Sequence, residues 1–118
     1  MYHILPESKR NVIAIRVEGY MRNQDYQSLL PFIEELIKKH GTIRILMDLR
    51  DCEGADFRGV LKVLPHAFRL SPKVGKEAII TDVKWIPLLV KLAGSFFKTE
   101  VRCFQSTETS KAWIWIKK

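Results

Sequence analysis

Four carboxylates lie close together in the segment Asp48–Lys62, which reads DLRDCEGADFRGVLK. They are Asp48, Asp51, Glu53 and Asp56. Clustered carboxylates are the ligands that Ca²⁺ prefers, but a calcium loop needs an acidic or amide residue at its third position and a glutamate at its twelfth. Counted from Asp48, those positions hold Arg50 and Gly59. Arg50 and Arg58 also neutralise much of the local charge, so we expect neither a metal nor a cofactor here.

Other sequence patterns that carry chemistry are missing. The sequence contains no GxGxxG or GxxxxGK phosphate loop, no GxSxG elbow and no HExxH pair. Cys52 and Cys103 fit no metal or redox spacing, which predicts two reduced thiols. His66 is flanked by apolar residues, as is typical of a partly buried helix histidine. We therefore predict a protein that is not an enzyme.

Apolar periodicity predicts an α/β fold with a mostly parallel sheet of about five strands and about four helices. The expected order is β-β-α-β-α-β-α-β-α in a single domain, 1–118. We expect strands at 2–5, 11–19, 42–49, 77–81 and 99–104, and helices at 23–41, 56–70, 82–98 and 106–118.

The sequence also predicts local features of these elements, some of them with two alternatives. Asn23 and Asp82 are the expected N-caps of their helices, because both residue types accept hydrogen bonds from the first turn. Pro31 should kink its helix or mark its first turn, and Pro65 should break or bend the next one. The segment 106–118 is rich in strand formers but begins with a helix-start signal, and we predict a helix.

The net charge of +7 is concentrated near the C-terminus. Residues 83–118 carry seven basic against two acidic side chains, a difference of +5. Such a segment suits an anionic partner: lipid headgroups, nucleic acid or an acidic protein. No apolar run approaches the roughly 20 residues of a membrane span. Without a secretory signal either, we expect a cytoplasmic protein, with peripheral membrane association as an alternative.

The element order and several residue patterns resemble the SpoIIAA-like fold, which STAS domains share and to which CRAL-TRIO lipid-binding domains are related. The pointers are VIAIRVEGYMRNQDYQSLLPFIEELIKKHGTIRILMDL, EAIITDVKW, EVRCF and KAWIWI, which together cover nearly the whole chain. The nearest branch is a group of small bacterial proteins called SpoIIAA-like or STAS/SEC14-type. The resemblance implies a binding or regulatory module.

The same resemblance gives the acidic segment a meaning. In STAS anti-sigma factor antagonists a strand ends in Asp-Leu, and after a loop a helix starts at Asp-Ser-Ser-Gly, where a serine is phosphorylated. Here Asp48-Leu49 matches the strand end and Asp56-Phe57-Arg58-Gly59 falls on the helix start, so both serines are lost. We predict an interaction loop without a phosphoswitch. Its candidate residues are Asp48, Asp51, Asp56, Phe57, Arg58 and Gly59.

Two functions compete on this basis. One is a protein partner, or a second copy of the chain, bound through residues 50–69. The other is a lipid, another apolar molecule or an anionic membrane surface bound through the helix 83–98. That helix has an expected core face of Ile86, Leu89, Val90, Ala93 and Phe97, and a second, candidate ligand or membrane face of Lys84, Trp85, Leu88, Lys91, Leu92 and Phe96. A helix apolar on two sides is also typical of burial or of a dimer contact. Nucleic-acid binding is disfavoured because no motif accompanies Trp113 and Trp115.

Overall fold

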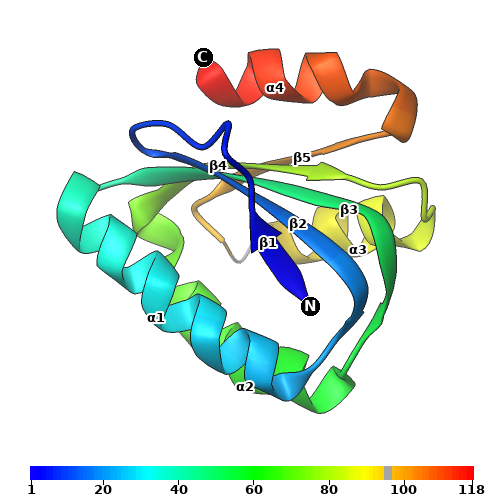
Figure 1. Ribbon diagram of the computed structural model, residues 1–118, viewed down its shortest axis with the longest axis horizontal. Coiled ribbons are helices and arrows are strands. Elements are labelled where there is room, and N and C mark those ends of the chain that lie inside the picture. Colours follow the sequence, from blue (N-terminus) through cyan, green and yellow to red (C-terminus); the bar gives the residue numbers. More distant parts are fainter. Residues whose placement is uncertain (95–96) are drawn as a thin grey trace.

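A computed structural model describes residues 1–94 and 97–118. Within them, five strands form one sheet in the order β1-β2-β3-β4-β5 (Figure 1). The strands are β1 (Tyr2–Ile4), β2 (Val12–Met21), β3 (Ile43–Ala55), β4 (Val74–Ile80) and β5 (Glu100–Phe104). β1 is antiparallel to β2, and every other neighbouring pair is parallel. The predicted α/β class and element order are confirmed.

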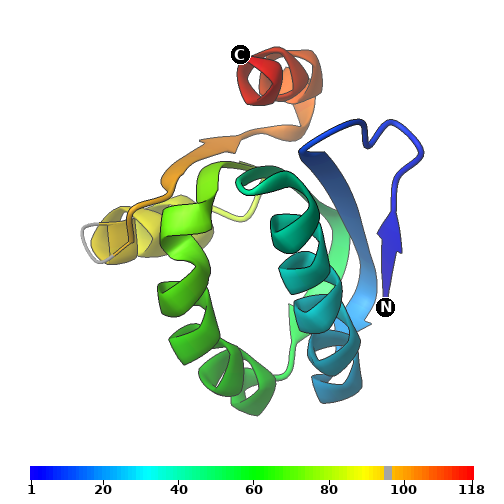
Figure 2. The same cartoon turned by 90° about the vertical axis from the view of Figure 1, so that its left-hand side faces the viewer.

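Helices cover both faces of the sheet. They are α1 (Asn23–His40), α2 (Phe57–Leu70), α3 (Trp85–Ala93) and α4 (Thr109–Lys117), with short 3-10 turns at Ser71–Lys73 and Ser106–Glu108. Figure 2 shows α1, α2 and α3 on one side of the sheet and α4 alone on the other. The helix predicted for 106–118 is therefore present.

The sheet has a buried core on each face because successive side chains of a strand point to opposite faces and the strands carry apolar residues on both. Ile13, Ile15 and Val17 of β2 pack with Leu29 and Ile37 of α1 in one core cluster. Ala14 lies between Ile13 and Ile15 in β2, so its side chain points to the opposite face and belongs to the other cluster. That second cluster lies under α4 and comprises Ala14, Leu46, Ala78, Ile80, Ala112 and Ile116.

The segment predicted as a loop after residue 49 is instead strand. β3 continues to Ala55 because β2 is long enough to pair with it, from Glu18 opposite Asp51 to Met21 opposite Ala55. β4 ends earlier, opposite Asp48. The second half of β3 therefore pairs with β2 alone and leads straight into α2 at the far end of the strand.

The helix starts also differ from the predictions. The N-cap of α1 is Arg22, not Asn23, and the Asp25 carboxylate accepts the Arg22 backbone N–H at 2.8 Å. α3 starts at Trp85, because Asp82 instead accepts a hydrogen bond from the Ser106 backbone N–H at 2.9 Å. Pro31 and Pro65 both lie inside helices, so neither ends one.

Candidate functional site

Asp48 lies near the middle of β3 and is buried, with 4% of its surface exposed. Its carboxylate accepts two side-chain hydrogen bonds from Arg50, from Nε at 2.9 Å and from Nη2 at 2.7 Å, and one from the Arg50 backbone N–H. Burial by itself raises the pKa of Asp48, but the hydrogen bonds from Arg50 outweigh it and keep that pKa below its usual value. Because its carboxylate already accepts these hydrogen bonds within the chain, Asp48 has little hydrogen-bonding capacity left for a binding partner.

The other predicted loop residues have separate local roles. Asp51 pairs with Arg16 of the neighbouring strand at 3.0 Å. Asp56 is the N-cap of α2 and accepts the Arg58 backbone N–H at 3.0 Å. Among the described residues, no group of three or more His, Cys, Asp or Glu side chains could hold a metal ion. The acidic residues are thus spread along β3 and the start of α2 and do not converge on a single point.

The first turn of α2 packs closely on α1. A Cβ on Gly59 would lie 2.6 Å from the ring of Tyr26, so this position needs the small residue. Arg58 is exposed, and the described residues give its side chain no ion pair. The predictions for the side chains of Phe57 and Phe96 fall outside what the structure describes.

The outer face predicted for α3 is exposed. Trp85, Leu88 and Leu92 expose 62%, 61% and 68% of their surfaces, and Lys84 and Lys91 are exposed beside them. The core face predicted for the same helix is only partly right, because Leu89 is also 54% exposed. None of the described residues of α3 is buried, and Ile86, Val90 and Ala93 are only partly buried. The helix therefore packs loosely on the sheet.

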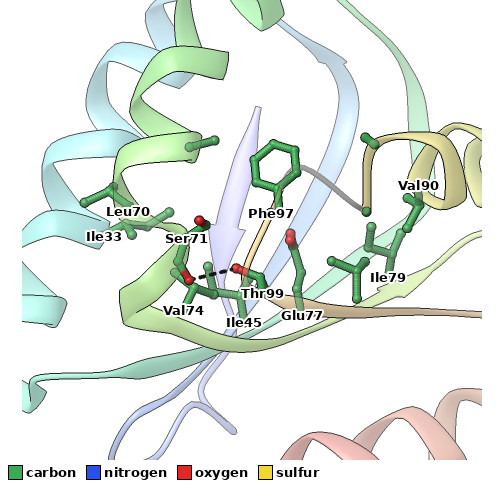
Figure 3. Close-up of a pocket in the computed structure, with 14 residues that line it drawn as sticks. Ile33, Ile45, Leu70, Ser71, Val74, Glu77, Ile79, Val90, Phe97 and Thr99 are labelled. Atoms are coloured by element: carbon green, nitrogen blue, oxygen red, sulfur yellow. Dashed lines mark hydrogen bonds between the residues drawn. The ribbon is translucent and has the colours of Figure 1, made fainter.

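An apolar pocket lies between α2, α3 and the sheet, and we call it the α2–α3 pocket (Figure 3). Its cavity volume is about 250 Å³. Its described lining residues are Ile33, Ile45, Ala67, Leu70, Ser71, Val74, Glu77, Ile79, Val90, Ala93, Gly94, Phe97, Thr99 and Val101. Of these only Glu77 is ionisable, and none is Lys, Arg or His.

Glu77 of β4 extends from the sheet into this pocket (Figure 3). Its strand neighbours in register are Ile45 on β3 and Val101 on β5, both apolar lining residues. No residue in the described part of the chain donates a hydrogen bond to the Glu77 carboxyl or forms an ion pair with it. Burial raises the pKa of Glu77 from 4.5 to about 7.

The hydroxyl groups in the pocket have their hydrogens engaged elsewhere. Ser71 Oγ donates to the Phe68 carbonyl at 3.0 Å and receives the Lys98 backbone N–H at 3.4 Å. Thr99 Oγ1 donates to the Ser71 carbonyl at 3.1 Å. For a ligand this leaves two polar groups: the Thr99 oxygen, which is an acceptor, and the Glu77 carboxyl, which is purely an acceptor once it is ionised.

The sequence reasoning missed Glu77 and the pocket. The stretch from Glu77 onward was predicted as a short buried strand, which is right, but the strand begins earlier, at Val74. The available signal was alternation, since Glu77 shares a strand face with Ile79 while Ala78 and Ile80 belong to the core under α4. A charged residue on an otherwise apolar strand face is the sequence signal that indicates this site.

The fold and this pocket define a small α/β domain with an apolar cavity between its helices and its sheet. The family profile described as SpoIIAA-like matches residues 12–117. The chain therefore belongs to the SpoIIAA-like family. No curated protein matches the sequence.

Solved structures share the fold at low sequence identity. One is an uncharacterised protein of the DUF3478 family with a SpoIIAA-like fold from Shewanella loihica PV-4, with a TM-score of 0.79, 19% identity and coverage of 98% of this chain and 93% of that one. The anti-sigma factor antagonist SpoIIAA in its unphosphorylated form gives 0.65 and 16%, covering 97% of this chain and 98% of that one. The Bacillus cell fate determinant SpoIIAA in the phosphorylated form gives 0.65 and 15%, covering 94% and 97%. These neighbours confirm the fold expected from the sequence.

Proposed function

We propose that this protein is a non-catalytic module that binds an apolar small molecule or lipid chain in the α2–α3 pocket. The observation that carries the proposal is the pocket lining, in which apolar side chains from three helices and three strands surround the cavity and Glu77 is the one ionisable group among the described lining residues. Pockets of this composition, with few polar groups that fix orientation, are typical of small-molecule sites.

The size of the pocket sets the class of ligand. An apolar cavity of about 150 Å³ in a protein holds benzene, so the 250 Å³ here accommodates a longer chain or a larger ring. Each methylene group taken out of water contributes about 0.8 kcal/mol. Burial of a chain of several methylenes in the pocket therefore supplies enough free energy for measurable binding.

Filling the pocket from α2 tests the proposal. We expect Ala67→Phe to weaken binding of the neutral probe 1-octanol by about tenfold or more, because the added ring takes up ligand volume and costs several buried methylene contacts. Isothermal titration calorimetry measures the affinity.

Leu64→Phe is the matched control, since Leu64 lies one turn earlier on α2 and does not line the pocket. Equal loss in both variants, or no octanol binding by the natural sequence, would contradict a ligand site at this place.

A membrane surface is a second candidate, favoured by the exposed apolar side chains around the pocket. Large apolar residues of α2, α3 and the turn before α3 are exposed: Leu61, Leu64, Phe68, Val83, Trp85, Leu88, Leu89 and Leu92. Lys84 and Lys91 add positive charge to α3, within the basic last third of the chain. A helix with aromatic, aliphatic and basic side chains at its surface suits an anionic lipid interface. No helix among the described residues is long and apolar enough to cross a bilayer.

Vesicle flotation tests this second candidate. The natural sequence is expected to float with vesicles of phosphatidylcholine and phosphatidylglycerol and to be released by salt. The triple variant Trp85→Ser, Leu88→Ser, Leu92→Ser is expected to lose at least about tenfold in bound fraction, because it removes most of the apolar surface of α3.

Ile114→Ser is the control, since Ile114 is exposed on α4, on the opposite face of the sheet. If the triple variant floats as well as the control does, or if the natural sequence stays unbound, the membrane assignment is wrong.

Protein interaction through residues 50–69, with the candidate loop residues from Asp48 to Gly59, stays a prediction with weaker support. Asp48 and Asp51 each have an arginine partner within the chain, and Asp56 caps α2. The segment 50–62 contains no Ser, Thr or Tyr, so phosphorylation of a hydroxyl cannot regulate it there.

A further inference from the structure

We propose that the α2–α3 pocket selects an apolar molecule with a cationic amine head, and that Glu77 binds this head. The inference rests on the proposed ligand-binding function and specifies its ligand class. It follows from the position of the Glu77 carboxyl, to which no described residue donates a hydrogen bond, in a pocket where the other described polar groups are acceptors.

The pocket is unsuited to an anionic head. A carboxylate or phosphate needs donors or a positive charge, and the described lining contains no Lys, Arg or His. Ser71 and Thr99 already donate their hydroxyl hydrogens to backbone carbonyls. An anion here would also lie beside Glu77, and two like charges close together in an apolar site repel strongly. Fatty-acid-like ligands are therefore disfavoured.

An ammonium head satisfies what the pocket lacks. It brings N–H donors and a positive charge to the Glu77 carboxylate, and one further N–H can reach a free lone pair of Thr99 Oγ1. Much of the cost of removing the Glu77 carboxylate from water is met when the protein folds. An ammonium group that pairs with this carboxylate therefore adds an electrostatic stabilisation that is absent when the pocket is empty. The alkyl part then contacts the apolar lining of α2 and α3.

Few titratable groups face Glu77, so the expected pH dependence of ligand binding follows the titration of Glu77. α2 presents Ala67 and Leu70, and α3 presents Val90 and Ala93. On β5 the titratable neighbour is the Cys103 thiol, whose pKa is raised by burial and by the charge of Glu77. Lys91, Glu100 and Arg102 line an adjacent depression on the outer side of α3 and β5, not this pocket.

Three probes with the same chain and different heads test the inference: octylamine, 1-octanol and octanoate, titrated by calorimetry at about pH 8. We expect octylamine to bind at least about tenfold more tightly than octanoate. Between about pH 6 and about pH 8 the ionised fraction of Glu77 rises about tenfold, so octylamine affinity should rise by a similar factor while the amine stays protonated.

Glu77→Gln should remove both the preference for the amine and its pH dependence, and should keep octanol binding. Octanoate binding as tightly as octylamine, or an amine affinity that does not change with pH, would overturn the inference. Those results leave the proposed function standing if octanol binds. Failure of all three probes would instead contradict the proposed function itself. The head-group series and the pH series use the natural sequence, so the test does not depend on the variant folding.

Discussion

Glu77→Gln is expected to make the ligand-free protein more stable by about 3 kcal/mol at about pH 8 and to change its stability little at about pH 4. The reason is the burial that raises the pKa of Glu77 from 4.5 to about 7 in the folded chain. Below the unfolded-state value the carboxyl is protonated in both states, so it contributes no pH dependence. As the pH rises, the unfolded chain releases the proton first, and the folded state loses stability until the folded pKa has been passed.

Chemical denaturation at both pH values, with the natural sequence and the variant side by side, measures this effect. The difference between the two proteins isolates Glu77 from other groups that titrate over the same range. Glu100→Gln is the control, because Glu100 is an exposed carboxylate on the adjacent strand β5. A Glu77 variant whose stability difference is the same at both pH values would show that the carboxyl is well solvated, which would also weaken its assignment as a ligand anchor.

The overall fold could be predicted from the sequence because its signals are local and repeated. β2 begins with an apolar run at residues 12–15, which is typical of a strand buried on both faces, and Leu29, Ile33 and Ile37 recur at helical spacing in α1. Gly41, with a φ of 83°, ends α1 in a positive-φ conformation that glycine adopts freely. Each of these signals acts within a few residues, so the order of elements followed without knowledge of long-range contacts.

The length of β3 could not be predicted in the same way. Residues 50–55 are mostly polar and contain a glycine, which is typical of a loop, yet they pair with the end of β2. Whether a polar stretch forms a strand depends on a partner strand that lies far away in the sequence. The same long-range pairing supplies Arg16 as the partner of Asp51, and it explains why the acidic cluster seen in the sequence does not form a cluster in space.

The pocket also depends on long-range packing. Its lining comes from α1, β3, α2, β4, α3 and β5, and no short segment contains a recognisable part of it. The sequence showed that the helix 83–98 has two apolar sides, but not that the inner side would leave a cavity over Glu77. The helix instead rests on the sheet through a few half-buried residues. That partial packing leaves room beneath α3, and our proposal of a polar-headed ligand rests on the Glu77 carboxyl in that space.

The second large effect is expected in α4, where Ile116→Ala should destabilise the protein by about 3 kcal/mol. Ile116 is fully buried, with 0% of its surface exposed, and packs with Leu46, Ala78 and Ile80. Truncation removes apolar contacts and leaves a cavity, because in the described structure α4 is the one helix on that face of the sheet. The free energy of unfolding from denaturant titration measures the loss.

Ile114→Ala provides the comparison within the same helix. Ile114 is 58% exposed, so its truncation should change stability by no more than about 0.5 kcal/mol. The contrast between two isoleucines two residues apart also tests the choice between helix and strand for this segment, since residues at i and i+2 share one face in a strand but not in a helix. Equal destabilisation by both substitutions would contradict a helix lying on the sheet through Ala112 and Ile116. It would also reopen the assignment of α4 as the layer that covers this face of the sheet.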